Sequence, residues 1–242
     1  MLIFSRYNLV LLAVHKTGST ALEVALGQEA DGRFGNPPEL KHLPLYRYNR
    51  FVRPLLQLTT GKDPETFALI REPISWLRSW YRYRARNSMA GSPTSTCHIS
   101  FDQFVRDTMS DDPSPFAQIG CQTRFLSPGG NGGPITHLFQ YEQMDVACKF
   151  LENRLELELD LPWLNQAAAS PAPLDPALEA QYRQIHADEF QLWRDAFTEA
   201  APYDTGTATS STACVRSFSE NGFCKNTDPS ISDCCFSNAS SA

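Results

Sequence analysis

Short apolar runs alternate with amphipathic segments along most of this 242-residue chain. Apolar residues predominate at 9–14, 66–70 and 135–141, and each run is too short for a typical helix, so we expect strands there. Residues 2–4 are a fourth strand candidate. Strands that alternate with helices predict an α/β domain with a mostly parallel central sheet, flanked by helices in three layers.

Amphipathic periodicity predicts the helices that cover this sheet. Two of them have marked starts: Ser100 with Gln103 forms a capping box, and Asp175 with Pro176 forms an N-cap and N1 pair. The predicted helices are residues 19–28, 74–86, 101–109, 142–159 and a last one from 176 to 197.

Composition divides the chain into a folded part and a tail. In the folded part, residues 31–44 and 110–134 are rich in Gly and Pro and are expected to be loops. Beyond about residue 203, Ser, Thr and Cys become frequent, large apolar side chains become rare, and no period is visible, which is typical of disorder. We therefore predict an α/β domain over residues 1–203 and a disordered tail over 204–242.

Charge and cysteine content narrow the range of partners. A formal net charge of −6 argues against binding to nucleic acid, because readers of a phosphate backbone usually carry a basic surface. No apolar run approaches the roughly 20 residues that a membrane helix needs. The seven cysteines contain no CxxC pair, so no metal site is predicted. We expect a cytoplasmic protein without nucleic-acid, membrane or metal partners, and the sequence gives no prediction of its oligomeric state.

The apolar run at 9–14 ends in a basic, Gly-containing turn that leads directly into a helix. The turn and the start of the helix consist of His15, Lys16, Thr17, Gly18, Ser19 and Thr20. The first N–H groups of a helix have no partner within it, and the positive end of the helix dipole lies behind them. Together with the charge of Lys16, these donors predict a site for a phosphate or sulfate group.

A second strand, turn and helix follow, again with a cation at the junction. The strand at 66–70 ends at Arg71-Glu72-Pro73, and Pro73 suits the first turn of a helix because its missing N–H costs nothing there. Ligands bind at the carboxyl ends of the strands in α/β sheets. If the two strands are neighbours in the sheet, Lys16 and Arg71 face one cleft.

These two junctions resemble the signature elements of the PAPS-dependent sulfotransferases, closest to their carbohydrate-type and bacterial branch. In that family a Pro-Lys-Thr-Gly-Ser/Thr-Thr/Ser loop holds the 5′-phosphosulfate of 3′-phosphoadenosine 5′-phosphosulfate (PAPS). An Arg-Asp-Pro element holds the 3′-phosphate, with a Ser eight residues after the Arg and a Tyr two residues later. Arg71, Ser79 and Tyr81 have this spacing.

The resemblance implies a P-loop-like fold and sulfuryl transfer from PAPS to a hydroxyl group of a small-molecule or carbohydrate acceptor, without a metal. The residues that it assigns to the donor are His15, Lys16, Thr17, Gly18, Ser19, Thr20, Arg71, Ser79 and Tyr81. Lys16 would also act in catalysis, by neutralising the leaving phosphate oxygen. The chain departs from the family at three positions: His15 replaces Pro, Glu72 replaces Asp, and Trp76 stands where many members have Arg.

A hydroxyl acceptor needs a base, and histidine is the side chain whose pKa lies nearest to neutrality. We select His42, because Lys41-His42-Leu43-Pro44 is similar to the segment that carries the base in several sulfotransferases. The alternatives are that His42 is a loop histidine bonded to the backbone, or that His15, beside the predicted sulfate, is the base.

Two other functions are consistent with a strand, a basic loop and a helix. A P-loop kinase would need a further Gly before the Lys and a second strand that ends in Asp to hold Mg²⁺. Residues 10–17 contain no Gly, and the strand at 66–70 is followed by Arg71. A non-catalytic nucleotide-binding protein would need neither Lys16 nor His42.

Overall fold

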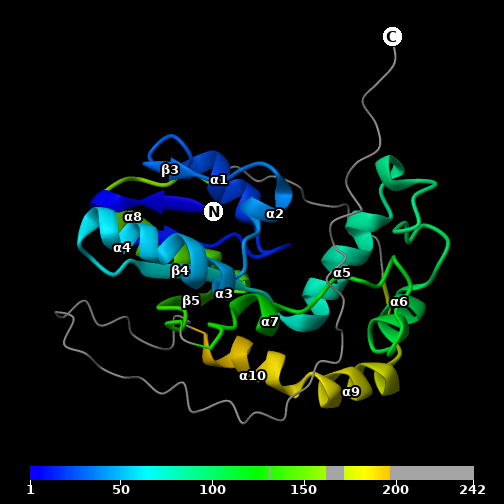
Figure 1. Cartoon of the computed structure of the whole chain (residues 1–242). Coiled ribbons are helices and arrows are strands. Elements are labelled where there is room, and N and C mark those ends of the chain that lie inside the picture. Colours follow the sequence, from blue (N-terminus) through cyan, green and yellow to red (C-terminus); the bar gives the residue numbers. More distant parts are fainter. Residues whose placement is uncertain (131, 162–171, 197–242) are drawn as a thin grey trace.

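In the computed structural model, which describes residues 1–130, 132–161 and 172–196, the chain has an α/β fold with a five-stranded sheet flanked by helices (Figure 1). The strands are β1 (Leu2–Phe4), β2 (Leu9–Leu11), β3 (Gly32–Arg33), β4 (Glu65–Ile70) and β5 (His137–Gln140). Their order across the sheet is β3-β1-β2-β4-β5. The predicted tail, residues 204–242, lies outside the described residues.

The sheet is mixed, which corrects the prediction of a mostly parallel one. β2, β4 and β5 are parallel neighbours, but β1 pairs antiparallel with both β2 and β3. The cause is the short connection from β1 to β2, a single turn of 3₁₀ helix at Ser5–Tyr7 and Asn8 in the left-handed region (φ 53°). A parallel pair needs a much longer crossover, so such a tight turn allows only antiparallel pairing.

The helices described are α1 (Ser19–Leu26), α2 (Pro38–Lys41), α3 (Leu45–Arg47), the π-helical segment η2 (Tyr48–Val52), α4 (Arg53–Thr60), α5 (Pro73–Arg84), α6 (Phe101–Thr108), α7 (Gln122–Leu126), α8 (Met144–Leu155), α9 (Pro176–Ile185) and α10 (Ala187–Asp195). Further single turns of 3₁₀ helix are η3 (Asn87–Met89) and η4 (Tyr141–Gln143). Both predicted starts are confirmed, because Ser100 accepts from the N–H of Gln103 and Asp175 accepts from the first turn of α9.

Four predicted helices exist with slightly different bounds, but two predicted loops and the predicted last helix are wrong. The segment 31–44 contains β3 and α2, and the segment 110–134 contains α7. The last helix is two helices, because the chain bends at His186 between α9 and α10. The helical stretch from α3 to α4 was not predicted at all.

Side chains of the strands alternate between two cores, one on each face of the sheet. Leu9, Leu11 and Phe67 pack with α1 and α8, whereas Val10 and Ile70 pack on the opposite face with α3, η2, α7 and α10. A fully buried Leu or Phe side chain stabilises a fold by about 1.5–3 kcal/mol, so these two layers hold the sheet in place. A third apolar cluster joins α5 to α6 and α9, on the right of Figure 1.

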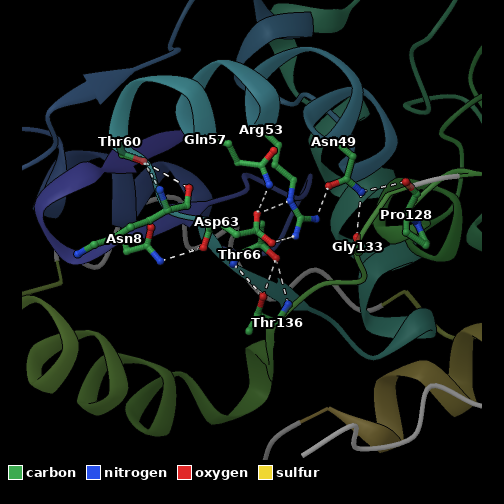
Figure 2. Close-up of polar contacts among 11 residues, drawn as sticks. Asn8, Asn49, Arg53, Gln57, Thr60, Asp63, Thr66, Pro128, Gly133 and Thr136 are labelled. Atoms are coloured by element: carbon green, nitrogen blue, oxygen red, sulfur yellow. Dashed lines mark hydrogen bonds and ion pairs between the residues drawn. The ribbon is translucent and has the colours of Figure 1, made fainter. Parts of the chain in front are cut away.

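A network of polar side chains ties the amino ends of the parallel strands to α4 (Figure 2). The guanidinium of Arg53 donates to both carboxylate oxygens of Asp63, which precedes β4 (Nε to Oδ1 2.7 Å). Asn49 accepts from Arg53 and donates to the carbonyls of Pro128 and Gly133, both 2.9 Å away. The hydroxyls of Thr66 and Thr136 each accept a backbone N–H of the other residue.

Within the described residues, no helix combines the length and the apolar character that crossing a membrane requires.

Candidate functional site

The loop between β2 and α1 is a tight turn with an unusual backbone conformation. Lys16 and Gly18 both lie in the left-handed region, with φ of 64° and 76°, and α1 begins at Ser19. A left-handed residue other than glycine is uncommon and is often found at functional sites. A hydrogen bond within the loop stabilises this conformation: the buried hydroxyl of Thr17 donates to the carbonyl of Val14 (3.0 Å).

Gly18 is required by its neighbours as well as by its φ. A Cβ atom at this position would lie 3.0 Å from Cε of Met144 and 3.2 Å from Cε2 of Tyr141. Both are side chains at or near the start of α8, so α8 packs directly against the turn.

Arg71 joins the second predicted junction to the first. β2 and β4 are adjacent and parallel, so the residues that follow them lie at one edge of the sheet. The Nη1 atom of Arg71 donates to the carbonyl of Lys16 (3.1 Å), and its Nε donates to the hydroxyl of Ser75 (2.9 Å). Its guanidinium also lies 4.4 Å from the centre of the Tyr141 ring. The two junctions are therefore one structural unit.

The charge of Lys16 is held among aromatic rings. Its Nζ lies 4.1 Å from the ring centre of Tyr83 and 5.6 Å from that of Trp80, both on α5. Burial, and then the charges of Arg86 and Arg71, lower the pKa of Lys16 to about 8. Among the described residues, no carboxylate forms an ion pair with Lys16 or Arg71.

His42 lies against the same loop, although the chain reaches it only after α1 and β3. Its ring stacks on that of His15, with centroids 3.9 Å apart and planes inclined by 19°. Its Nδ1 lies 2.7 Å from the carbonyl oxygen of Ala13. A carbonyl only accepts, so Nδ1 carries the proton and Nε2 has the free lone pair.

Both histidines are neutral near pH 7. Burial is the main cause that lowers the pKa of His42 to about 4, and Lys41 lowers it further, while the bond to Ala13 opposes the shift. Burial, followed by the electrostatic interactions with His42 and Lys16, lowers the pKa of His15 to about 3. A neutral imidazole can accept a proton, but burial and then the neighbouring cations make it a weak base in the absence of an anion.

Lys41, the residue before His42, is bound to α1. Its ammonium pairs with Glu23 of α1 (2.6 Å) and lies 3.4 Å from the hydroxyl of Thr20. Glu23 also accepts from Arg33 of β3 (3.0 Å to Nε). Direct contacts therefore link α2 to α1, and no prediction from the sequence included Glu23.

The structure brings most of the predicted site residues together, but not Tyr81. Its hydroxyl donates to the carbonyl of Ile99 (2.7 Å), and its ring packs on Phe101 and Phe104 of α6. Ser79 lies half-buried on α5, one turn beyond the Ser75 that Arg71 contacts. Because residues four apart share a helix face, Ser79 is on the side of α5 that faces Arg71.

Three further residues shape the loop. Trp76 donates from its indole nitrogen to the carbonyl of His15 (2.8 Å), at the position where the sulfotransferases often have Arg. Tyr141 covers Arg71, and Gln122 bonds the Arg71 backbone. Trp76 had a sequence signal, because it departs from the family pattern, whereas Tyr141 and Gln122 come from segments with no recognisable motif.

Comparison of the chain with protein-family models, with curated proteins and with solved structures gave no match. In the described part of the chain, no three His, Cys, Asp or Glu side chains are grouped so that they could hold a metal ion.

Proposed function

We propose that this protein transfers a sulfuryl group from PAPS to a hydroxyl group of a small-molecule or carbohydrate acceptor, on a P-loop-like domain. One observation carries the proposal. Lys16 and Arg71 follow adjacent parallel strands, are joined by a 3.1 Å hydrogen bond, and have no carboxylate partner among the described residues. Glu142 and Glu72 attract the charge of Arg71 from beyond ion-pair distance. Two partly buried cations that have no carboxylate in direct contact favour a ligand with more than one anionic group.

The donor would lie along the edge of the sheet. In this proposal the N–H groups of Gly18, Ser19 and Thr20 receive the 5′-phosphosulfate at the start of α1, where the first N–H groups of a helix have no partner within it. Arg71 offers a planar fork for the 3′-phosphate, and Ser79 a hydroxyl on the same side of α5. Bound anions would favour the charged form of Lys16, whose pKa is lowered to about 8 in the free protein.

The chemistry requires little from the protein beyond position and charge. The oxygen of the acceptor forms a bond to sulfur while the bond between sulfur and the 5′-phosphate oxygen breaks. Lys16 stabilises the charge that develops on that leaving oxygen. The hydroxyl proton passes to Nε2 of His42, whose Nδ1 proton is held by Ala13. The negative charge of the donor raises the pKa of His42 toward the range of a useful base.

An ATP-dependent kinase fits this site less well. A kinase of the P-loop class holds Mg²⁺ with an acid after a neighbouring strand. Here β4 is followed by Arg71, and the guanidinium of Arg71 is directed to the loop itself. A protein that only binds nucleotides would have no use for a proton acceptor at His42.

Thermal stabilisation by ligands tests the proposal. We expect 3′-phosphoadenosine 5′-phosphate to stabilise the protein by about 2.7 kcal/mol at a hundredfold excess over its Kd, and ATP-Mg to have a smaller effect. Adenosine 5′-phosphate, which lacks the 3′-phosphate, should bind less tightly than the bisphosphate. In an Arg71→Ala variant the two nucleotides should bind about equally.

Stabilisation by ATP-Mg without stabilisation by the bisphosphate would contradict the proposal. Equal affinity of the wild-type protein for the bisphosphate and for adenosine 5′-phosphate would remove Arg71 from the role given to it.

A further inference from the structure

The side-chain amide of Gln122, on α7, holds the backbone of Arg71 through two hydrogen bonds. Its Oε1 accepts from the N–H of Arg71 (2.9 Å), and its Nε2 donates to the carbonyl of Arg71 (2.8 Å). An amide group that bonds both the N–H and the C=O of one residue imitates the pairing of a neighbouring strand. The amide of Gln122 therefore continues the hydrogen-bond ladder one residue beyond the end of β4.

Glu189 of α10 determines which way the Gln122 amide points. Its Oε1 accepts from both the backbone N–H and the Nε2 of Gln122, each at 3.0 Å. If the amide were rotated by half a turn, its oxygen would face the Glu189 oxygen and the Arg71 carbonyl, and three bonds would be lost. Both side chains are buried, with an exposed fraction of 1% each, so water offers no replacement partner.

The chain of contacts ends at the side chain of Arg71, which is predicted to bind a phosphate group. Arg71 has one bond to Ser75 and one to the carbonyl of Lys16, and both depend on where its backbone lies. Since the guanidinium of arginine binds phosphate through a fixed fork, its position affects affinity strongly. α10, far along the chain, is thus connected to the anion loop by Glu189, Gln122 and Arg71.

We propose that Gln122, oriented by Glu189, is the positioning residue for Arg71 and sets the affinity of the site for the phosphate that Arg71 binds. The part of this inference that concerns phosphate rests on the proposed function, whereas the two hydrogen bonds that hold the Arg71 backbone do not. Neither residue touches the ligand in this scheme, and both act through Arg71.

Hydrogen exchange and ligand affinity together test the inference. In Gln122→Leu, which keeps the size of the side chain but removes both bonds to Arg71, we expect the Arg71 amide hydrogen to exchange at least tenfold faster than in the wild-type protein. That factor corresponds to losing one or two ordinary hydrogen bonds. The Kd for 3′-phosphoadenosine 5′-phosphate should rise about tenfold, and the Kd for adenosine 5′-phosphate should stay nearly constant.

The matched control is Gln118→Leu, which removes an exposed side-chain amide that donates to the carbonyl of Pro113 (3.0 Å) in the segment before α7. It should leave the Arg71 exchange rate and both dissociation constants unchanged. An unchanged exchange rate of the Arg71 amide hydrogen in Gln122→Leu would show that Gln122 does not hold the Arg71 backbone. Faster exchange with unchanged bisphosphate affinity would overturn the positioning role.

Two substitutions at Glu189 give a second route if Gln122→Leu does not fold. Glu189→Gln keeps an oxygen that can accept from Gln122 and should stay within about threefold of the wild-type protein, whereas Glu189→Leu should show the tenfold changes. Equal behaviour of these two variants would overturn the orienting role of Glu189. A wild-type protein that does not bind the bisphosphate would contradict the proposed function. The exchange rates would still decide whether Gln122 holds the Arg71 backbone.

Discussion

The two ends of the parallel strands differ in whether their cations are paired with carboxylates. At the amino ends, the cations have carboxylate partners: Arg53 binds Asp63 (Figure 2), and Arg154 pairs with Glu65 (3.1 Å), which also lies 2.8 Å from Nε2 of His137. At the carboxyl ends, Lys16 and Arg71 form no ion pair with any described residue, although burial lowers the pKa of both.

This difference separates groups that stabilise the fold from groups that are available to a ligand. Charges that are paired with each other gain little from a further anion, whereas partly desolvated cations without counter-ions gain much. The backbone does not separate the two ends in the same way, because Asn8 before β2 (φ 53°) and Lys16 after it (φ 64°) both lie in the left-handed region.

The largest expected effect is at Lys16. We expect Lys16→Ala and Lys16→Gly each to lower the rate of sulfuryl transfer by about 10²–10³-fold, the usual cost of losing one group that stabilises transition-state charge. Their stabilities should differ, because a left-handed alanine costs on the order of 1 kcal/mol and a glycine does not have that penalty. Rates with a defined acceptor and urea unfolding measure the two effects.

A Lys16→Gly protein that transfers at the wild-type rate would show that the uncompensated charge is not used in catalysis. The comparison of the two ends would then lose its functional meaning.

The stacked histidines predict a second, smaller effect that depends on pH. The pKa of His42 is about 4 in the fold and about 6.5 in an unfolded chain, so below pH 6.5 the unfolded chain takes up protons that the folded one does not. The free energy of unfolding should therefore fall as the pH falls, by up to about 2 kcal/mol between pH 6.5 and 5 for this group. Chemical denaturation at several pH values measures the slope.

In His42→Asn, which keeps a donor for the Ala13 carbonyl, that slope should be smaller. The exposed His98 gives the matched control, since His98→Asn should leave the slope as it is in the wild-type protein. An identical slope in His42→Asn would mean that His42 is not held neutral by its surroundings.

The smallest effect is expected at the amino ends of the strands. Asp63→Asn removes the charge that Arg53 binds but keeps the shape, and should lower the free energy of unfolding by about 1 kcal/mol, because the pair is partly exposed. Binding of 3′-phosphoadenosine 5′-phosphate should not change. A loss of affinity in Asp63→Asn would show that the two ends of the sheet are not independent.

The predictions from the sequence succeeded where one local signal decides the structure. The apolar runs at 66–70 and the Pro73 start of α5 depend only on neighbouring residues, and so does the turn that places Lys16 before α1. That the strands of Lys16 and Arg71 are neighbours could be stated only as a condition, and the structure meets it.

The remaining features depend on residues far apart in the sequence. The orientation of β1 follows from one tight turn, which a pattern of apolar residues does not reveal. Gln122 is an ordinary polar residue in a Gly- and Pro-rich segment, and only the position of Arg71 gives it a role. The family spacing pointed to Tyr81, but packing against α6 directs its hydroxyl to Ile99, so its role in binding the donor stays a prediction.

The order of the strands has a consequence for how the site is assembled. β1 pairs with β2 and β3 through residues that all lie within the first 33 of the chain, such as Phe4 with Leu9 and Ile3 with Gly32. β4 pairs with β5 through residues that are far apart in the sequence, such as Phe67 with His137. Contacts between such distant residues form slowly. During synthesis we therefore expect the half of the site that contains Lys16 to acquire its strands early, and the half that contains Arg71 to be completed only after β5 and α7 have left the ribosome.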